Sequence, residues 1–340
     1  KAIYIIVNIF VGLGLLSKPY ALAKGGWVSL IGLTIACFIA SFTASLLVES
    51  FKMCGCKKIT YPELGYAAMG SIGKWIIQTI VCVEVLSYIV IILIVFLENL
   101  HYLIPFVPYS FLMMGGSMVL FPILIPSKIK NMSFFSILGV FTNLLIFGTV
   151  FVLFISHPRV STEYHFFTDM KGLSISTGIY IISLGGHIAI PTIYRNMKNK
   201  EHIHYVLKMS FFLIWMIYIG MAICGYLFFG KDVSVIVTKD IQSHAPSYYF
   251  IGMVSLILFK LYLTIPSLLF VLFKPEEHVP VVTLFKSMIF SCLVILAYIL
   301  HHHLALVEAL SGTICTMNTS MILPIILYVS LRYTRVKNSH

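Results

Sequence analysis

The fold is decided by two stretches, NIFVGLGLLSKPYAL at residues 8–22 and YIISLGGHIAIPTIY at residues 180–194. Both are apolar runs that carry a pair of glycines near the middle, Gly12 with Gly14 and Gly185 with Gly186. In both, a proline follows five residues after the second glycine, at Pro19 and Pro191. Glycine lacks a Cβ atom and proline lacks an N–H group, so the pattern predicts two helices that unwind locally.

The composition indicates that these helices lie in lipid. Hydrophobic residues make up 59% of the 340 positions, charged residues only 10%, and the mean hydropathy is +0.99. A soluble domain carries about a quarter charged residues. In lipid only helices and closed barrels satisfy every backbone polar group, and continuous apolar runs favour helices over the alternating strands of a barrel. The predicted fold class is therefore an all-α integral membrane protein.

About ten transmembrane helices are expected from the lengths of the apolar runs. These runs cover residues 2–22, 27–49, 72–100, 109–125, 133–155, 173–194, 206–230, 247–273, 281–303 and 304–331. The connecting loops are short, so residues 1–340 are expected to form a single transmembrane domain. The chain opens inside an apolar run without an initiator methionine, and we expect it to be a piece of a longer protein.

The basic residues predict the orientation. One set of alternate loops, together with the C-terminal tail, holds 13 Lys and Arg residues, and the other set holds six. Cytosolic loops carry the excess of positive charge, so both ends of the chain are expected in the cytosol. The net charge of +11 follows from these loops and does not indicate nucleic-acid binding.

The two glycine pairs also predict an internal repeat. Gly186 follows Gly14 by 172 positions, which divides ten spans into a first repeat at 1–155 and a second at 173–331. Five spans in each repeat would invert the second relative to the first. Interrupted helices at matching places in two repeats indicate the midplane substrate site of a secondary transporter. A simpler explanation is also open, because glycine and proline are common where membrane helices pack closely.

An unwound helix has the chemistry to bind a zwitterion. Free amides at the start of one half-helix suit a carboxylate, and free carbonyls at the end of the other suit an ammonium group or a cation. A neutral amino acid carries both charges. The expected substrate-binding residues lie around the two breaks and are Asn8, Gly12, Gly14, Leu15, Leu16, Ser17, Tyr88, Tyr180, Ser183, Gly185 and Gly186.

Several motifs resemble those of a known family. Residues 8–27 read N-x-x-x-G-x-G-L-L-S-x-P-Y-A-x-x-x-G-G-W, and T-Y-P-E-L-G, P-S-K and G-H-x-x-x-P-x-x-Y follow at 60–65, 126–128 and 186–194. Together they resemble the amino acid/auxin permease family, in particular its vacuolar amino acid transporter branch, which includes the vesicular inhibitory amino acid transporter. The resemblance implies a five-plus-five inverted repeat with the first and sixth helices interrupted, proton-coupled amino acid movement, and a vacuolar or other endomembrane location. Lys18 departs from the family pattern, which usually has a small or uncharged residue there.

Three ionisable residues inside the spans are candidates for proton coupling: Glu84, His187 and Lys260. A charge at bilayer depth costs at least ~2.5 kcal/mol and therefore needs a partner or a function. Glu84 and Lys260 lie at the centres of their spans and are expected to be close enough to pair, in which case a purely structural ion pair is the alternative. His187 could equally be a packing residue. Glu308 is expected to pair with a histidine of 301–303.

The sequence thus predicts a single transmembrane transporter domain that moves neutral amino acids by symport or antiport. Protons rather than sodium are the expected coupling ion, and the bilayer and a small-molecule amino acid are the expected partners. Phosphate-cradling, zinc-protease and nucleophile-elbow motifs are missing, so we predict no catalytic residue, no cofactor and no metal site, and the protein is not expected to be an enzyme. A transporter-like amino acid sensor without net flux and a channel remain as alternatives.

Overall fold

The computed structural model describes residues 2–54, 60–120, 132–157, 163–272 and 280–337. Throughout these ranges the regular elements are helices, as the composition predicts. The P-S-K motif at 126–128 lies outside the described residues.

The helices of the N-terminal half are α1 (Ala2–Phe10), the 3₁₀ turn η1 (Leu13–Leu15), α2 (Lys18–Gly25), α3 (Ser29–Cys54), α4 (Tyr61–Leu103), α5 (Tyr109–Leu120) and α6 (Met132–Ser156). Those that follow up to residue 242 are α7 (Met170–Ile182), η3 (His187–Ala189), α8 (Ile190–Asn196), η4 (Lys200–His202), α9 (Ile203–Phe229), η5 (Gly230–Asp232) and α10 (Thr238–Gln242). The last are α11 (Ser247–Leu272), α12 (Pro280–Leu300), η6 (His301–His303), α13 (Leu304–Ser311), the π-helical η7 (Gly312–Thr316) and η8 (Asn318–Ile322), and α14 (Leu323–Lys337).

Seven helical segments in the described part of the chain are long and apolar enough to cross a membrane. They are Ser29–Cys54, Tyr61–Leu103, Ile137–Ser156, Met170–Asn196, Lys200–Asp232, Ser247–Ile265 and Leu284–Val336. The run at 2–22 is not among them because it is divided into α1 and α2, of 9 and 8 residues, whereas a span needs roughly 20. The last segment contains both α12 and α13 to α14. The ten spans and their inverted repeat stay a prediction.

One predicted loop is partly wrong. Residues 50–71 were expected to connect two spans, but α3 continues to Cys54 and α4 begins at Tyr61. Thr60 is extended and Pro62 stands in the first helical turn, where its missing N–H group costs nothing. The T-Y-P-E-L-G motif therefore starts a helix, and Gly70, with φ of 67°, makes the kink inside α4.

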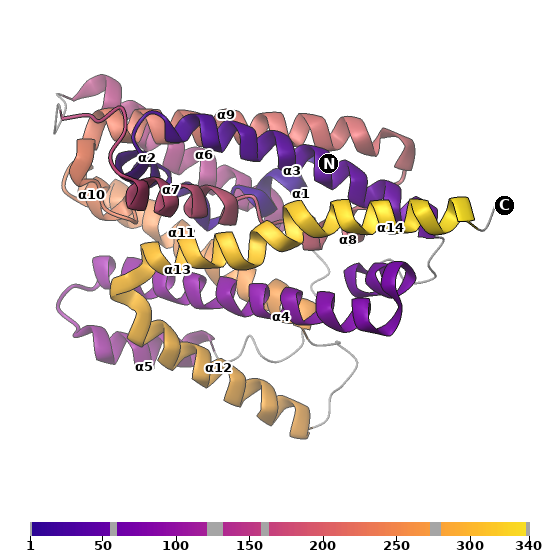
Figure 1. Cartoon of the computed structure of the whole chain (residues 1–340). Coiled ribbons are helices and arrows are strands. Elements are labelled where there is room, and N and C mark those ends of the chain that lie inside the picture. Colours follow the sequence, from indigo (N-terminus) through magenta and orange to yellow (C-terminus); the bar gives the residue numbers. More distant parts are fainter. Residues whose placement is uncertain (1, 55–59, 121–131, 158–162, 273–279, 338–340) are drawn as a thin grey trace.

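The longer helices lie side by side, and the short half-helices are enclosed among them (Figure 1). The half-helix α2 packs against α7 and α9, and α13 packs against α7. The final helix α14 packs against α3, while α5 and α12 lie together on the outer side of α4. Segments 172 residues apart in sequence are thereby brought into the centre of one bundle.

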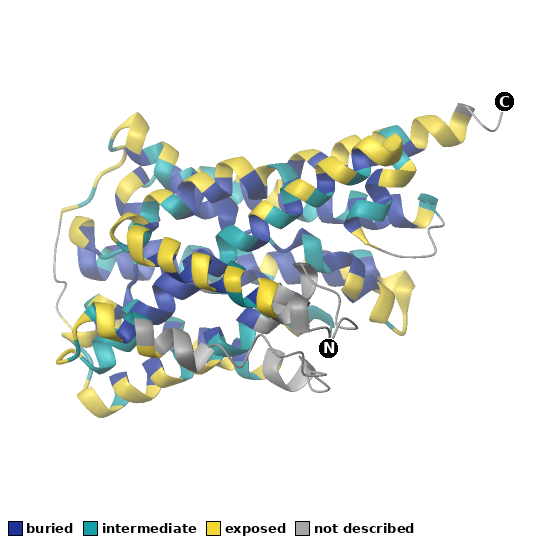
Figure 2. Ribbon diagram, turned by 90° about the horizontal axis from the view of Figure 1, so that it is seen from below, coloured by how far each residue is buried: buried dark blue, intermediate teal, exposed yellow. Residues whose placement is uncertain are grey.

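Buried residues line the inside of the bundle and exposed residues its outside (Figure 2). Many large apolar side chains are found in both groups. Large side chains point outward from several helices; Phe38, Ile72 and Trp75 are 72%, 74% and 70% exposed. Such an exterior would be unfavourable in water but is the surface that lipid solvates. The interior, in contrast, contains charged groups such as Lys18, Glu84 and Glu308.

Candidate functional site

Both predicted interruptions are confirmed. In the first stretch α1 ends at Phe10, and after the turn η1 the helix resumes at Lys18. In the second, α7 ends at Ile182 and the helix resumes through η3 into α8. Both glycine pairs fall between the half-helices, as the lack of a Cβ atom led us to expect.

The two breaks touch each other. A Cβ atom on Gly14 would overlap the side chain of Ser183 and lie 3.1 Å from its Cα atom. A Cβ atom on Gly186 would lie 2.6 Å from Cζ of Phe10. Gly12 is different, since the nearest atom to a Cβ there is the Ile9 carbonyl oxygen at 3.5 Å. Three of the predicted residues thus meet where α1 ends and α7 ends, and Gly12 stands beside the contact.

Two tyrosine hydroxyl groups donate to main-chain carbonyl oxygens at the breaks. Oη of Tyr218, on α9, is 2.5 Å from the Phe10 carbonyl and 2.9 Å from that of Ser183. Oη of Tyr88, on α4, is 2.6 Å from the Ile182 carbonyl and 3.1 Å from that of Gly185. Buried helix ends need such partners. A hydroxyl has one proton to donate, so each tyrosine shares it between two acceptors.

Lys260 lies at the first break and does not pair with Glu84. Its ammonium donates to Oδ1 of Asn143 at 2.5 Å and to the Val11 carbonyl at 3.2 Å. The Asn143 amide nitrogen also donates to that carbonyl. The predicted Glu84–Lys260 pair is therefore wrong, because the carbonyl freed after α1 and the amide of α6 supply the acceptors instead.

Glu84 is 1% exposed and faces the two π-helical segments. The Thr316 and Thr319 side chains lie beside its carboxyl group, while its Oε2 atom is buried without a hydrogen-bond partner among the described residues. Tyr88, one turn along α4, has its hydroxyl 3.5 Å from Oγ1 of Thr316. π-helical turns occur frequently at functional sites. Here the π-helical residue Thr316 lies between the Glu84 carboxyl group and Tyr88, whose hydroxyl binds the second break.

Lys18 has no exposed surface, and its ammonium reaches the end of α7. It donates to Oγ of Ser183 and lies 3.4 Å from the Ile179 carbonyl oxygen. Glu308, on α13, interacts with it electrostatically, and Oγ of Ser17 donates to Glu308 Oε1 at 3.1 Å. The expected pairing of Glu308 with the 301–303 histidines is wrong, since α13 turns this carboxylate inward toward α2.

His301, at the start of the histidine run, has other partners. Its Nδ1 atom is 2.5 Å from the Tyr298 carbonyl oxygen, and its ring stacks on Tyr109 with centroids 4.5 Å apart. The run is therefore held by an aromatic cluster at the junction of α12 and α13.

His187 is fully buried and packed. Its Nε2 atom is 3.1 Å from the Ala40 carbonyl oxygen and 3.2 Å from Oγ1 of Thr43, both on α3. The rings of Phe10 and Phe211 contact it at 5.9 and 6.2 Å between centroids. The geometry gives it a packing role at the second break, and its part in coupling stays a prediction.

The other predicted residues divide between the breaks and their surroundings. Leu15 and Leu16 are buried, and the Leu16 carbonyl accepts from the Val237 amide at 3.2 Å. Tyr180 places its ring below Lys18 and its hydroxyl 3.3 Å from Oγ of Ser29. Asn8 is not brought to the breaks, because its side chain abuts Gly139 of α6.

Sequence reasoning missed Tyr218, Asn143, Thr316 and Thr319. Asn143 had a signal, because an amide inside the apolar run 133–155 needs a partner. Tyr218 had none, since tyrosine is common in membrane helices and its position between two breaks arises only on folding.

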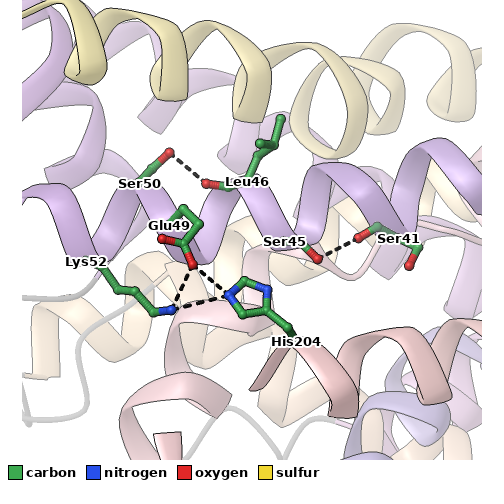
Figure 3. Close-up of polar contacts among 7 residues, drawn as sticks. All are labelled: Ser41, Ser45, Leu46, Glu49, Ser50, Lys52 and His204. Carbon is green, nitrogen blue, oxygen red and sulfur yellow. Dashed lines mark hydrogen bonds and ion pairs between the residues drawn. The ribbon is translucent and has the colours of Figure 1, made fainter. Parts of the chain in front are cut away.

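A second polar cluster lies toward the C-terminal end of α3. Figure 3 shows Glu49 of α3 between Lys52 and His204, with Oε1 at 2.8 Å from Nζ and 2.6 Å from Nε2. These groups are 35–39% exposed, and ion pairs of that kind contribute about 0–1 kcal/mol. Ser41, Ser45, Leu46 and Ser50 make only hydrogen bonds within the helix.

Comparison with known proteins agrees with the geometry. The chain is 27% identical to the amino acid transporter AVT1D of Arabidopsis thaliana over 98% of its own length and 63% of the relative's. It is 30% identical to the amino acid transporter AVT1J of the same plant over 70% of its length and 58% of the relative's. The vesicular GABA transporter of Caenorhabditis elegans is 26% identical over 76% of this chain and 53% of its own.

The chain thus spans less than two thirds of the length of these relatives, which are named as transporters and not as enzymes. The model of the family described as transmembrane amino acid transporter protein matches residues 1–339. With that match over nearly its whole length, and with two interrupted helices meeting inside an apolar bundle, the chain belongs to the transmembrane amino acid transporter protein family.

Proposed function

We propose that this protein is a secondary active transporter that moves neutral amino acids across a membrane. The observation that carries the proposal is the contact between the two breaks at Gly14 and Ser183, where helix ends from distant parts of the chain converge. The names of the relatives, which include amino acid transporters and a GABA transporter, support the substrate class.

The breaks offer complementary groups to a zwitterion. The carbonyls of Ile182 and Gly185 share the single hydroxyl proton of Tyr88, so one of them can accept from a substrate ammonium. The start of α2, apart from Pro19, offers backbone amides to a carboxylate, whereas at α8 Pro191 has no N–H group and the Ile190 amide already donates to the His187 carbonyl. A bound substrate would then replace hydrogen bonds that side chains such as Tyr88 now make to the breaks. The half-helices on either side of a break would move relative to each other as the site opens to one side of the membrane and then the other.

Proton coupling is proposed at Lys260, with Glu84 and His187 as further candidates. The Lys260 ammonium binds the Val11 carbonyl, a freed helix-end oxygen of the kind that binds cations in transporters. Losing its proton would weaken its hydrogen bonds to Val11 and Asn143 and so loosen the first break. Because an amine of the protein already stands at this carbonyl, protons rather than sodium are the proposed coupling ion, in symport or antiport.

The proposed topology has ten spans in an inverted repeat, 1–155 and 173–331, with both ends of the chain in the cytosol. A vacuolar or other endomembrane location is proposed from the resemblance to the vacuolar branch of the family.

Reconstitution into liposomes tests the function. Radiolabelled amino acids from a panel are measured in counterflow, with the pH gradient imposed in either direction. A transporter exchanges substrate saturably, a channel conducts without saturation, and a sensor binds without flux. Replacing sodium by choline at a fixed pH gradient should leave the rate unchanged, and a loss of transport in choline would contradict proton coupling.

A further inference from the structure

Lys18 sits in a set of groups suited to an ammonium ion. Its Nζ atom donates to Oγ of Ser183 and lies 3.4 Å from the Ile179 carbonyl oxygen, at the C-terminal end of α7. It also lies 4.4 Å from the centroid of the Tyr218 ring and 5.2 Å from that of Tyr180. Both distances are within the reach of cation–π attraction. Ring faces and helix-end oxygens therefore surround this charge from α7 and α9.

Glu308 completes the set as a counter-charge. It is 2% exposed, and Ser17, next to Lys18 in the chain, donates to its Oε1 atom. Its Oε2 atom is buried without a hydrogen-bond partner among the described residues. A carboxylate in an apolar interior is tolerated when a cation lies close, and Lys18 is the cation that interacts with it electrostatically.

We propose that Ser183, Ile179, Tyr180 and Tyr218 form an ammonium-binding cage that the chain fills with its own Lys18 side chain, with Glu308, held by the neighbouring Ser17, as a counter-charge beyond the direct contacts. The ligand class is a primary alkylammonium ion, here supplied on a tether. The tether is the Lys18 side chain, which runs from α2 to the end of α7. The end of α7 therefore needs no external cation. The inference goes beyond the proposed function, because binding to the cage requires no transport.

Chemical rescue tests the cage. Lys18→Ala removes three carbon atoms and the amine, which together correspond to propylammonium. The melting temperature of the purified variant is measured in detergent with increasing propylammonium chloride, against equal concentrations of sodium chloride and tetramethylammonium chloride. We expect a lower melting temperature than in the parent protein and a saturable rise with propylammonium alone, since a ligand that binds only the folded state stabilises it. Tetramethylammonium has no N–H group to donate to Ser183 and is expected to have no effect.

Lys24→Ala is the matched control, because Lys24 stands on the same half-helix but is exposed. Its melting temperature should not respond to propylammonium. Lys18→Ala combined with Glu308→Gln should respond less than Lys18→Ala alone, because the counter-charge has been removed. A folded Lys18→Ala protein that responds equally to all three salts would overturn the proposal.

If Lys18→Ala does not fold, Lys18→Met decides the question, since it keeps the length of the side chain without the charge. We expect it to melt below the parent, and the addition of Glu308→Gln to restore part of the loss by removing the uncompensated carboxylate. A Lys18→Met protein as stable as the parent would show that the cage does not favour an ammonium group. Each of these results stands whether or not the protein transports amino acids.

Discussion

At the scale of single residues, the site is held by side-chain donors that converge on main-chain carbonyl oxygens at the breaks. Tyr88 and Tyr218 each face two main-chain carbonyls with one hydroxyl proton, and Lys260 and Asn143 both donate to the Val11 carbonyl. Each of these carbonyls lies at or just beyond the end of an interrupted helix, and those of Phe10 and Ile182 also accept from the Gly12 and Gly185 amides. The side chains therefore stabilise the breaks without closing them into regular helix.

Removing the hydroxyl of Tyr88 should destabilise the second break. Tyr88→Phe leaves the Ile182 and Gly185 carbonyls without this donor, and an unsatisfied buried polar group costs about 1–3 kcal/mol. The expected result is a lower melting temperature in detergent. Tyr4→Phe is the control, since Tyr4 is 59% exposed, and it should melt with the parent protein. Equal melting of both variants would contradict the role of Tyr88.

The proposed proton coupling can also be tested at single residues. Lys260→Met removes the ammonium from the Val11 carbonyl, and a hydrogen bond to a charged group is worth about 1.5–3 kcal/mol. Uptake driven by a pH gradient should then fall by about tenfold or more, while counterflow at equal pH persists. Glu84→Gln is measured in the same assay. If both variants kept normal proton-driven uptake, neither residue would couple transport to protons.

At the scale of helices, the glycines differ in what they permit. Gly14 allows the turn η1 to touch Ser183 at the end of α7, whereas Gly12, two residues earlier, has no atom closer than 3.5 Å to its missing Cβ position. The two prolines act together with the glycines, since each stands in the first turn of a resumed half-helix. In the repeated pattern, therefore, a glycine permits a close contact and each proline stands where a half-helix begins again.

Gly14→Ala and Gly12→Ala form a matched pair that measures this contact. The first adds a methyl group that overlaps Ser183, and overpacking of this kind costs about 1–3 kcal/mol. The second adds the same group where space exists. We expect Gly14→Ala to lower both the melting temperature and the counterflow rate, and Gly12→Ala to change neither. Similar losses in the two variants would mean that backbone flexibility, and not the contact, requires glycine.

At the scale of the whole molecule, apolar side chains determine which surface faces lipid, and basic residues determine the expected orientation in the membrane. The exterior exposes large apolar side chains to lipid, and the basic residues are concentrated in one set of loops, 13 against six. The small Glu49 cluster lies on α3 six residues beyond Thr43, about 9 Å along the helix axis at a rise of 1.5 Å per residue, and Thr43 contacts His187 at the second break.

The asymmetry of basic residues predicts where the C-terminus lies. A protease-cleavable tag added after the last residue should be cut from the cytosolic side of sealed membrane vesicles and protected when the vesicles are inverted. A tag in the loop at 231–246 should behave oppositely and serves as the control. Cleavage of the C-terminal tag from the other side would reverse the proposed orientation.

Much of the fold and part of the site could be predicted from the sequence. Composition determined the helical membrane class, and Gly14 with Gly186 located both interruptions, because apolarity and the backbone freedom of glycine act locally. Partners could not be predicted in the same way. Glu84 and Lys260 were expected to pair because both lie at the centres of their spans. Instead, Lys260 donates to Asn143 of α6, and Glu84 lies beside Thr316 and Thr319.

The sequence by itself determined that two helices break and that charged groups lie inside an apolar bundle. Only the tertiary structure decided that Lys18 binds at the end of α7, that Lys260 binds after α1, and that Tyr218 lies between the breaks. The reason is physical. A buried charge takes the nearest unsatisfied polar group, and which carbonyls are unsatisfied, and what lies beside them, is established only when the helices pack.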